Sequence, residues 1–377
     1  MAGPARAIQY LLILNNNWID RLYNFKLLLK SEKKWLKKLS AIYSMLTKNK
    51  DIKLLNKNQV KEINDFFKNF DLKPNELWHN IYYRLNGNFD KRFIDDFIFY
   101  QSIEPELNNP FNNKVFSDKN YYEKFLPKDI QPATILRCIN YHLLDEDYHP
   151  VCPSNNIDTK LSEQITYIIK PSINSSGGRD VFPVIYSEEK FILNGKYFTL
   201  SELKNHYKGN FIIQEKLKQN DFLNEIYPFS LNTIRIMTLR MNNEVNILSS
   251  IIRFGTNNSV VDNVSSGGIC FGVNSSGNFS PFGLAYNFEK VFTHPNSGFR
   301  FEDNKFPFFS SVKDLAINLH NYLYHYNLVS WDLAIDDQNR PRFIEYNLFQ
   351  QEINYMQILN GPLFGKITDQ VLGDIRN

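Results

Sequence analysis

Residues 329–347, which read as two strands joined by a polar turn, constrain the fold of this chain more than any other stretch. The first strand is mostly apolar with a single acid, Asp332, and the turn ends in a proline, as hairpin turns often do. The second strand carries Glu345 and Asn347 two positions apart. Because side chains alternate along a strand, both point to one face, which Asp332 on the paired strand can reach.

These three side chains would form an all-oxygen set. Two carboxylates and an amide oxygen are the ligands that Mg²⁺ prefers, usually with nucleotide phosphates completing its coordination. The alternative is that they are solvent-facing polar residues of an ordinary antiparallel hairpin. The hairpin alone does not decide between the two interpretations, so the evidence must come from other segments.

The composition predicts a folded protein with a reducing, cytoplasmic location. At 377 residues, of which 43% are hydrophobic, the chain is long enough for roughly two or three domains with proper cores. A net charge of +3 gives no strong nucleic-acid signature. Cys138, Cys152 and Cys270 are far apart and have neither disulfide nor metal spacing. No stretch approaches the roughly 18 apolar residues of a membrane span.

Residues 1–113 are predicted to form a helical N-terminal domain. Apolar residues recur at three- and four-residue spacing over 18–46, and lysines from Lys26 to Lys38 line the opposite face. This basic face is either a solvated helix surface or a contact with an anionic membrane surface or another acidic partner. The second interpretation would place the protein at the periphery of the inner membrane.

A short buried strand over residues 167–170 ends in Lys170 and leads into the loop SINSSGGR. The backbone N–H groups of such a loop can fold over phosphates. It is not a Walker A motif, because no Gly-Lys-Ser/Thr opens a helix after it, and most such loops are plain hairpin turns. Lys170 is the stronger signal, since a lysine with a buried stem needs an anionic partner at its tip.

Two further strands place an arginine among apolar residues. Arg235 lies within LNTIRIMTL and Arg253 within VNILSSIIRF, and buried arginines are rarely unpaired. Their spacing suggests that they converge on one anion. The alternative is a structural salt bridge with an acid of the sheet. A second Ser/Gly loop, VVDNVSSGG, follows at residues 260–268.

Taken in order, these motifs resemble those of ATP-grasp proteins, and most closely the sugar-transfer associated ATP-grasp family found among bacterial surface-polysaccharide genes. The resemblance covers about residues 115–370 and rests on YIIKPSINSSGG, FIIQEKL, SLNTIRIMT, SSIIRFG, VVDNVSSGG, VSWD and FIEYNLFQQEI together. It implies an α+β fold whose two lobes sandwich ATP, with an N-terminal lobe over 114–212 and a C-terminal lobe over 213–377.

The resemblance also assigns roles to the residues that match the family's motifs. Two lysines would contact the α- and β-phosphates, a loop would cover the phosphates, and a hinge would hold adenine. Two arginines would act at the γ-phosphate and at an acyl-phosphate, and three oxygen ligands would bind Mg²⁺. In that order these are Lys119 and Lys170; Ser175, Ser176, Gly177 and Gly178; Gln214, Glu215, Lys216 and Leu217; Arg235 and Arg253; and Asp332, Glu345 and Asn347.

The function that the resemblance implies is an ATP- and Mg²⁺-dependent carboxylate–amine ligase that acts through an acyl-phosphate. Its partners would be a small-molecule carboxylate and an amine, such as an amino acid, an amino sugar or a sugar acid, and no nucleic acid. A kinase on the same fold and a non-catalytic nucleotide-binding module are the alternatives. One departure concerns the acceptor side, because LFQQEI follows Asn347 where many relatives have a Gly-rich turn.

Overall fold

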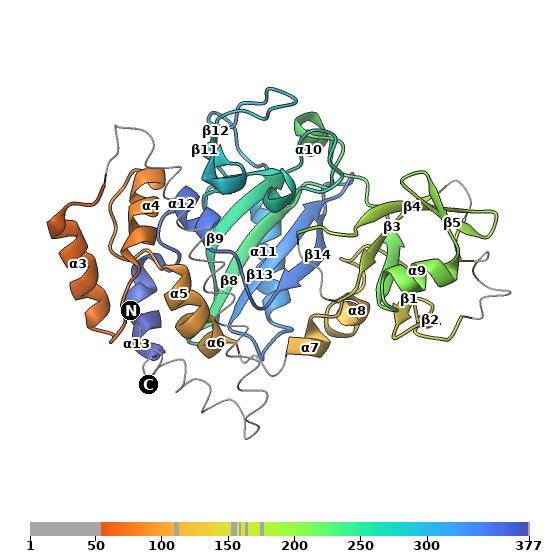
Figure 1. Ribbon diagram of the computed structural model, residues 1–377, viewed down its shortest axis with the longest axis horizontal. Helices are drawn as coiled ribbons and strands as arrows, with labels where there is room; N and C mark the ends of the chain where they lie inside the picture. Colours follow the sequence, from red (N-terminus) through yellow and green to blue (C-terminus); the bar gives the residue numbers. More distant parts are fainter. Residues whose placement is uncertain are drawn as a thin grey trace, which may run out of the picture. The chain divides into compact units, whose positions relative to one another are not determined.

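The computed structural model describes residues 54–108, 113–151, 157, 160–162, 165–173 and 177–375 (Figure 1). The predicted basic helix over 18–46 lies outside these residues, as do Ser175 and Ser176. The described chain divides into two compact units, one running from Tyr100 to Gly365 and the other containing the residues before and after it. None of the described helices combines the length and apolar character needed to cross a bilayer.

The unit that contains the described N-terminal residues is helical, as predicted. Side-chain caps begin its two longest helices, since Asn56 forms a capping box and Asn75 accepts from the backbone N–H of Leu77. Gly87, with φ +90°, ends the second of them in the left-handed conformation. The described helices of this unit are α3 (Lys57–Lys68), α4 (Glu76–Asn86), α5 (Asp96–Ile98) and α13 (Thr368–Asp374).

The unit from Tyr100 to Gly365 contains two seven-stranded antiparallel sheets, which confirms the predicted α+β class. The first sheet has the order β2-β1-β7-β3-β4-β5-β6. Its strands are β1 (Thr134–Ile139), β2 (His142–Leu144), β3 (Thr166–Pro171), β4 (Phe182–Ser187), β5 (Lys190–Leu193), β6 (Lys196–Phe198) and β7 (Phe211–Glu215), with α9 (Leu200–His206) after β6.

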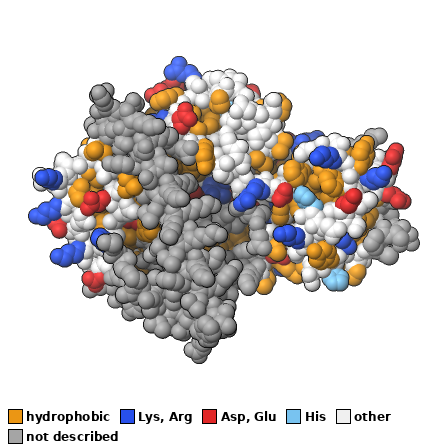
Figure 2. Space-filling model, viewed as in Figure 1, with side chains coloured by type: hydrophobic (Ala, Val, Ile, Leu, Met, Phe, Trp, Pro, Cys, Tyr) orange, Lys and Arg blue, Asp and Glu red, His pale blue; other side chains and the backbone are white. Residues whose placement is uncertain are grey.

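One face of the first sheet is apolar and the other carries the polar residues. Ile169 and Ile213 are paired across β3 and β7 and belong to the hydrophobic core of this sheet. Lys170 pairs with Ile212 in the next register position, so Lys170 projects from the opposite face. Over this part of the molecule, at the right of Figure 2, hydrophobic side chains are interspersed with charged ones. The exposed hydrophobic residues include Ile165, Ile185 and Tyr197.

The second sheet has the order β12-β11-β10-β9-β8-β13-β14. Helix α11 packs on β8, β9 and β13 and shares a core with Ile236 and Trp331, whereas α12 packs on β9, β10 and β11 (Figure 1). The strands are β8 (Ile234–Met241), β9 (Glu244–Phe254), β10 (Ile269–Val273), β11 (Phe279–Leu284), β12 (Lys290–Val291), β13 (Leu328–Ile335) and β14 (Pro341–Asn347), and the helices are α11 (Phe309–His320) and α12 (Asn354–Asn360).

Short helices precede the first sheet, connect the two sheets, and lie between or after the strands of the second sheet. These are the π-helix η1 (Phe99–Ile103), α6 (Glu104–Leu107), α7 (Asn113–Phe116), η3 (Lys119–Tyr121), α8 (Tyr122–Phe125), α10 (Asp221–Ile226), η4 (Val264–Ser266), η5 (Tyr286–Phe288) and η6 (Gly365–Ile367). The predicted strands over 167–170, 245–254, 329–335 and 343–347 all lie within observed strands. The boundaries predicted at 113 and 212 remain predictions. Strand β7, which belongs to the first sheet, spans the second of these positions.

Candidate functional site

A cavity of about 860 Å³ lies within the unit from Tyr100 to Gly365, and residues of both sheets line it. Most of the predicted site residues that the structure describes contribute to this lining. Arg235 and Asn347 are not among the lining residues. The predicted residues that line the cavity are Lys119, Lys170, Gly177, Gly178, Gln214, Glu215, Lys216, Leu217, Arg253, Asp332 and Glu345.

Two lysines form what we call the lysine wall, Lys119 in η3 and Lys170 at the end of β3. The Lys119 ammonium lies 3.2 Å from a carboxylate oxygen of Glu345. Lys170 is buried, and no carboxylate of the described residues lies within ion-pair distance of it. Burial, and then the nearby charge of Lys119, lower the pKa of Lys170 to about 8, although Glu345 opposes the shift. The cavity therefore contains a buried cation that forms no direct ion pair with any of the described residues.

The two Ser/Gly loops meet at the cavity. The Ser266 hydroxyl donates to the carbonyl of Gly177 over 2.7 Å. Gly178 has φ +69°, and a Cβ atom there would lie 2.6 Å from the Asn263 side-chain oxygen, so this close approach of the loops requires glycine. The loop at residues 260–268 was noted in the sequence without a role, and the structure places its residues 260–263 in the cavity lining.

The chain crosses from the first sheet to the second directly after β7. Gln214 donates to the carbonyl of Pro132 over 3.2 Å, and Glu215 accepts from the backbone N–H of Ala133 over 2.9 Å. Lys216 and Leu217 then line the cavity without belonging to a strand, and Gln219 bridges to the second sheet region. The predicted hinge residues therefore lie where the two sheets are connected.

The second sheet contributes what we call the arginine wall, formed by Arg235 and Arg253. Arg235 makes two parallel hydrogen bonds of 2.7 Å to the carboxylate of Asp332, and Arg253 reaches the same carboxylate at 3.0 Å. Burial alone would raise the pKa of Asp332, but the two guanidinium groups outweigh burial and hold it well below its usual range. The anion on which both arginines converge in this structure is thus a carboxylate of the sheet.

A second buried acid completes the arginine wall. Asp262 accepts from the hydroxyl and the backbone N–H of Thr233 at 2.5 and 2.9 Å, and lies 3.5 Å from Arg253. Arg253 also donates to the Thr233 hydroxyl. Among the described residues, none accepts a hydrogen bond from Nη1 of Arg235 or Arg253. These atoms leave each guanidinium a donor for a further anion. Sequence reasoning missed Asp262 and Thr233, because their partners are distant in the chain.

The predicted hairpin has the register that a metal site needs. Asp332 and Glu345 are direct cross-strand partners, and Asn347 stands opposite Ser330. Two carboxylates side by side repel one another unless a cation lies between or beside them. The amide nitrogen of Asn347 is buried without a hydrogen-bond partner among the described residues, and its assignment can be exchanged with that of the amide oxygen. Glu345 and Asn347 therefore fit a Mg²⁺ ion, whereas Asp332 would share oxygens that already accept from arginine.

The end of β14 is held by two buried residues that sequence reasoning did not identify. Asn108 donates to the carbonyls of Leu328 and Leu348 at 2.7 and 2.6 Å, and thereby joins β13 to the residue after Asn347. The carboxylate of Glu104 accepts from the backbone N–H groups of Gln350 and Gln351, both at 3.0 Å. Burial raises the pKa of Glu104 to about 7. The segment LFQQEI is thus held by side chains near α6 instead of by a Gly-rich turn.

Comparison with known proteins gives a family match for this arrangement. A family model described as sugar-transfer associated ATP-grasp matches residues 99–371. This span contains both sheets and all the predicted site residues. A search among curated proteins gave no significant match.

Solved structures with a similar fold include several ligases. The chain is 14% identical to a D-alanine–D-alanine ligase from Bacillus anthracis (TM-score 0.38, covering 71% of this chain and 68% of that one). It is 12% identical to an L-amino acid ligase from Bacillus licheniformis (TM-score 0.34, 66% and 48%). It is 11% identical to the ATP-grasp ligase PsnB, solved with a minimal precursor, Mg and ADP (TM-score 0.37, 72% and 62%). The chain therefore spans about half the length of the L-amino acid ligase.

Proposed function

Because the chain belongs to the sugar-transfer associated ATP-grasp family, we propose that it is an ATP- and Mg²⁺-dependent, ADP-forming carboxylate–amine ligase. In this proposal a substrate carboxylate attacks the γ-phosphorus of ATP, forming an acyl-phosphate and releasing ADP. An amine then attacks the acyl carbon, an amide forms, and phosphate leaves with one oxygen from the carboxylate. The substrates proposed are an amino acid or a sugar acid and an amine, joined during surface-polysaccharide synthesis.

The observation that carries this proposal is the buried Lys170, which forms no ion pair with the described residues, in a cavity that Lys119 and Arg253 also line. A triphosphate is the kind of ligand that such a set of cations accommodates. We assign the two lysines to the α- and β-phosphates and residues 175–178 to the loop that covers the phosphates. Residues 214–217 would hold adenine at the connection between the sheets.

The arginine wall is proposed to act where charge develops during phosphoryl transfer. The Nη1 atoms of Arg235 and Arg253, which donate to none of the described residues, can hold the oxygens of the transferring phosphoryl group and then of the acyl-phosphate. The hydrogen bonds of Arg235 to Asp332, and the ion pair of Arg253 with the same carboxylate, hold both guanidinium groups in place before any ligand arrives. Such fixed donors stabilise a developing negative charge without reorganising at the moment of reaction.

Glu345 and Asn347 are the residues proposed to hold Mg²⁺, and Asp332 would complete the set if it shared an oxygen with the ion. When bound, Mg²⁺ neutralises the charge of the phosphates. Glu345 would then exchange Lys119 for the metal, which frees the ammonium of Lys119 for the nucleotide. The adjacency of Asp332 and Glu345 supports this assignment, since two neighbouring carboxylates favour a divalent cation.

The kinase alternative uses the same side chains, so the two reactions must be separated by the fate of the phosphoryl group. Substrate labelled with ¹⁸O in its carboxylate should give labelled inorganic phosphate in the ligase reaction, with either the amine or hydroxylamine as acceptor. Mass spectrometry of the released phosphate measures this transfer. A stable phosphorylated product without free phosphate would assign the protein as a kinase. Nucleotide binding without any ADP release across acids and amines would instead indicate a non-catalytic module.

A further inference from the structure

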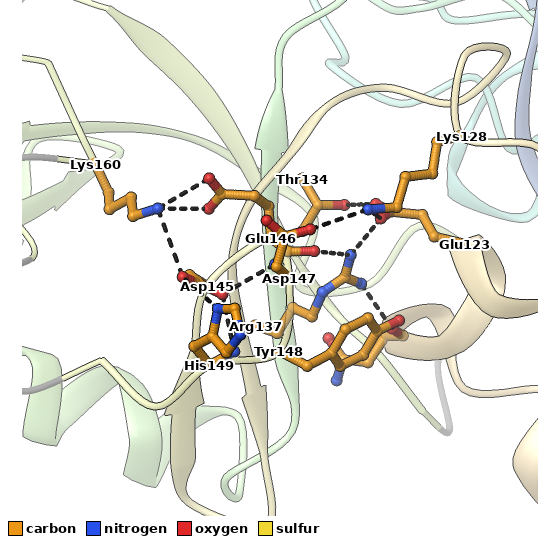
Figure 3. Close-up of polar contacts among 11 residues, drawn as sticks. Glu123, Lys128, Thr134, Arg137, Asp145, Glu146, Asp147, Tyr148, His149 and Lys160 are labelled. Carbon is orange, nitrogen blue, oxygen red and sulfur yellow. Dashed lines mark hydrogen bonds and ion pairs between the residues drawn. The ribbon is translucent and has the colours of Figure 1, made fainter.

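A buried arginine of the first sheet contacts η3, the short helix that carries Lys119 of the lysine wall. Arg137 on β1 is 0% exposed and forms a 2.6 Å ion pair with Glu123. Figure 3 shows its guanidinium between Glu123 and the ring of Tyr148, whose centroid lies 4.3 Å away. Glu123 also accepts from the Thr134 hydroxyl over 2.5 Å. Arg137 is therefore enclosed by the protein and is not itself available to a ligand.

Arg137 and Tyr148 converge on one backbone carbonyl. Arg137 Nη1 donates to the carbonyl oxygen of Asn120 over 2.6 Å, and the Tyr148 hydroxyl donates to the same oxygen over 2.7 Å. Asn120 also donates from its side chain to the carbonyl of Cys138. Asn120 directly follows Lys119, so these bonds hold the short helix η3 against β1.

The backbone of Lys119 is anchored on its other side as well. Its N–H donates to the carbonyl of Ser172 over 2.9 Å, and Ser172 lies two residues after Lys170. In the register of the first sheet, Arg137, Ile212 and Lys170 occupy one row across β1, β7 and β3, so their side chains share a face. Lys119 is thus held between the strand that carries Arg137 and the strand that carries Lys170.

A buried ion pair is a costly way to stabilise a fold. Apolar residues of similar volume are often as stabilising or more so, because the desolvation of both charges offsets their attraction. Arg137 does supply something that an apolar side chain cannot, which is a donor aimed at the Asn120 carbonyl. The presence of Arg137 in the core is explained if the protein must hold η3, and with it Lys119, in a fixed position.

We propose that Arg137, fixed by Glu123 and assisted by Tyr148, is a positioning residue that places Lys119 for contact with the phosphates of a nucleoside di- or triphosphate. The proposal rests on the proposed role of Lys119 in nucleotide binding. It predicts that weakening the contacts to the Asn120 carbonyl lowers nucleotide affinity through Lys119 alone.

Tyr148→Phe is the mildest test, because it removes one hydroxyl and leaves the ring that stacks on Arg137. We expect Tyr148→Phe to weaken the binding of ADP with Mg²⁺ about three- to tenfold, the equivalent of one hydrogen bond. Isothermal titration calorimetry measures this affinity. Tyr82→Phe is a matched control, because Tyr82 also donates to a carbonyl, that of Ile94, in the other unit of the chain. It should leave the affinity unchanged.

A double-mutant cycle with Lys119→Met separates positioning from a general structural effect. If Tyr148 acts through Lys119, then Tyr148→Phe should no longer change ADP affinity once Lys119 is methionine. Its effect on thermal stability should persist in both backgrounds. Equal losses of affinity with and without Lys119 would overturn the positioning role, and so would an unchanged affinity in Tyr148→Phe.

Two further outcomes keep this inference distinct from the proposed function. If Lys119→Met alone left ADP affinity unchanged, the assignment of Lys119 to nucleotide would fail, and the positioning role with it. If Lys119→Met weakened binding but the cycle were additive, only the positioning role would fail. If the Arg137→Lys variant folds, it serves as a second probe. It should weaken ADP binding in the wild-type background and have no such effect in the Lys119→Met background.

Discussion

The lysine wall and Arg253 of the arginine wall line the same cavity, but the two walls are neutralised in different ways. The arginines are paired before any ligand is present, since Asp332 binds both and Asp262 lies beside Arg253. Lys170 has no ion-pair partner among the described residues. The arginine wall is therefore close to charge balance. In the lysine wall, by contrast, the positive charge of Lys170 remains for a bound anion to neutralise. The difference shows that buried cations of one site can be held by acids of the protein, as the arginines are, or can be left for a ligand to neutralise, as we propose for Lys170.

Removing one charged group should lower folding stability in the arginine wall but not in the lysine wall. The largest effect is expected at Asp332. Asp332→Asn leaves two buried guanidinium groups without their carboxylate, which should lower the free energy of unfolding by about 3–5 kcal/mol. Urea unfolding followed by circular dichroism measures this change. Asp314→Asn on the exposed surface of α11 is the control and should stay within about 0.5 kcal/mol of the wild type. If Asp332→Asn changed the free energy of unfolding as little as the Asp314→Asn control, the stability of the arginine wall would not depend on Asp332.

Glu345 joins the two walls, because it is the cross-strand partner of Asp332 and the ion-pair partner of Lys119. Glu345→Gln keeps its shape but removes its charge, so we expect ADP formation to slow by about 10²-fold or more. Stability should change little, since the Lys119 pair is partly exposed on the Glu345 side. The exposed Glu244→Gln supplies the control for both assays. Near-normal ADP formation in Glu345→Gln would remove Glu345 from the metal site.

Lys170→Met tests the lysine wall directly. Nucleotide affinity should fall about tenfold or more, which corresponds to the loss of about 1.4 kcal/mol of binding free energy. Folding stability should be unchanged or higher, because the variant removes an unpaired buried charge. Calorimetric titration with ATP and urea unfolding measure the two quantities, with the half-exposed Lys313→Met as a control. A loss of stability with unchanged affinity would make Lys170 a structural residue.

The sequence predicted the strands and the hairpin well, because alternation within one segment depends only on local order. The register that brings Glu345 opposite Asp332 follows from such alternation, although the irregularity after Asp332 was not predicted. The pairing of both arginines with Asp332 could not be predicted in the same way. It depends on β8 lying between β9 and β13, an arrangement of segments that are far apart in the chain.

Other parts of the site escaped prediction for the same physical reason. No pattern in the sequence marked Arg137, since its partners Glu123, Asn120 and Tyr148 come from three different segments. Glu104 belongs to a region predicted as part of a separate helical domain, yet it binds the segment after β14. Contacts of this kind are set by tertiary packing, which no local pattern encodes.

The last prediction sharpens the contrast between the walls through pH. The pKa of Lys170 in the folded protein is about 8, below its ordinary value of 10.5. As the pH rises from about 7 to 9, Lys170 loses its proton and its attraction for phosphate, so the affinity for ADP should fall by about tenfold. The arginines stay charged over this range and contribute no such dependence. Calorimetric titrations at pH 7, 8 and 9 measure the slope.

The same proton should act on folding with the opposite sign. Above about pH 8 the unfolded chain still binds a proton at Lys170 and the folded chain does not, so the free energy of unfolding should rise with pH relative to Lys170→Met. Lys170→Met should show neither effect. This variant retains Glu104, whose pKa of about 7 also lies near this pH range, so it controls for the titration of that carboxyl group. Opposite slopes for binding and stability in the wild type alone would identify Lys170 as the titrating group. If the pH profiles of ADP affinity and stability were parallel in wild type and Lys170→Met, the proposal that the charge of Lys170 binds the nucleotide phosphates would be refuted.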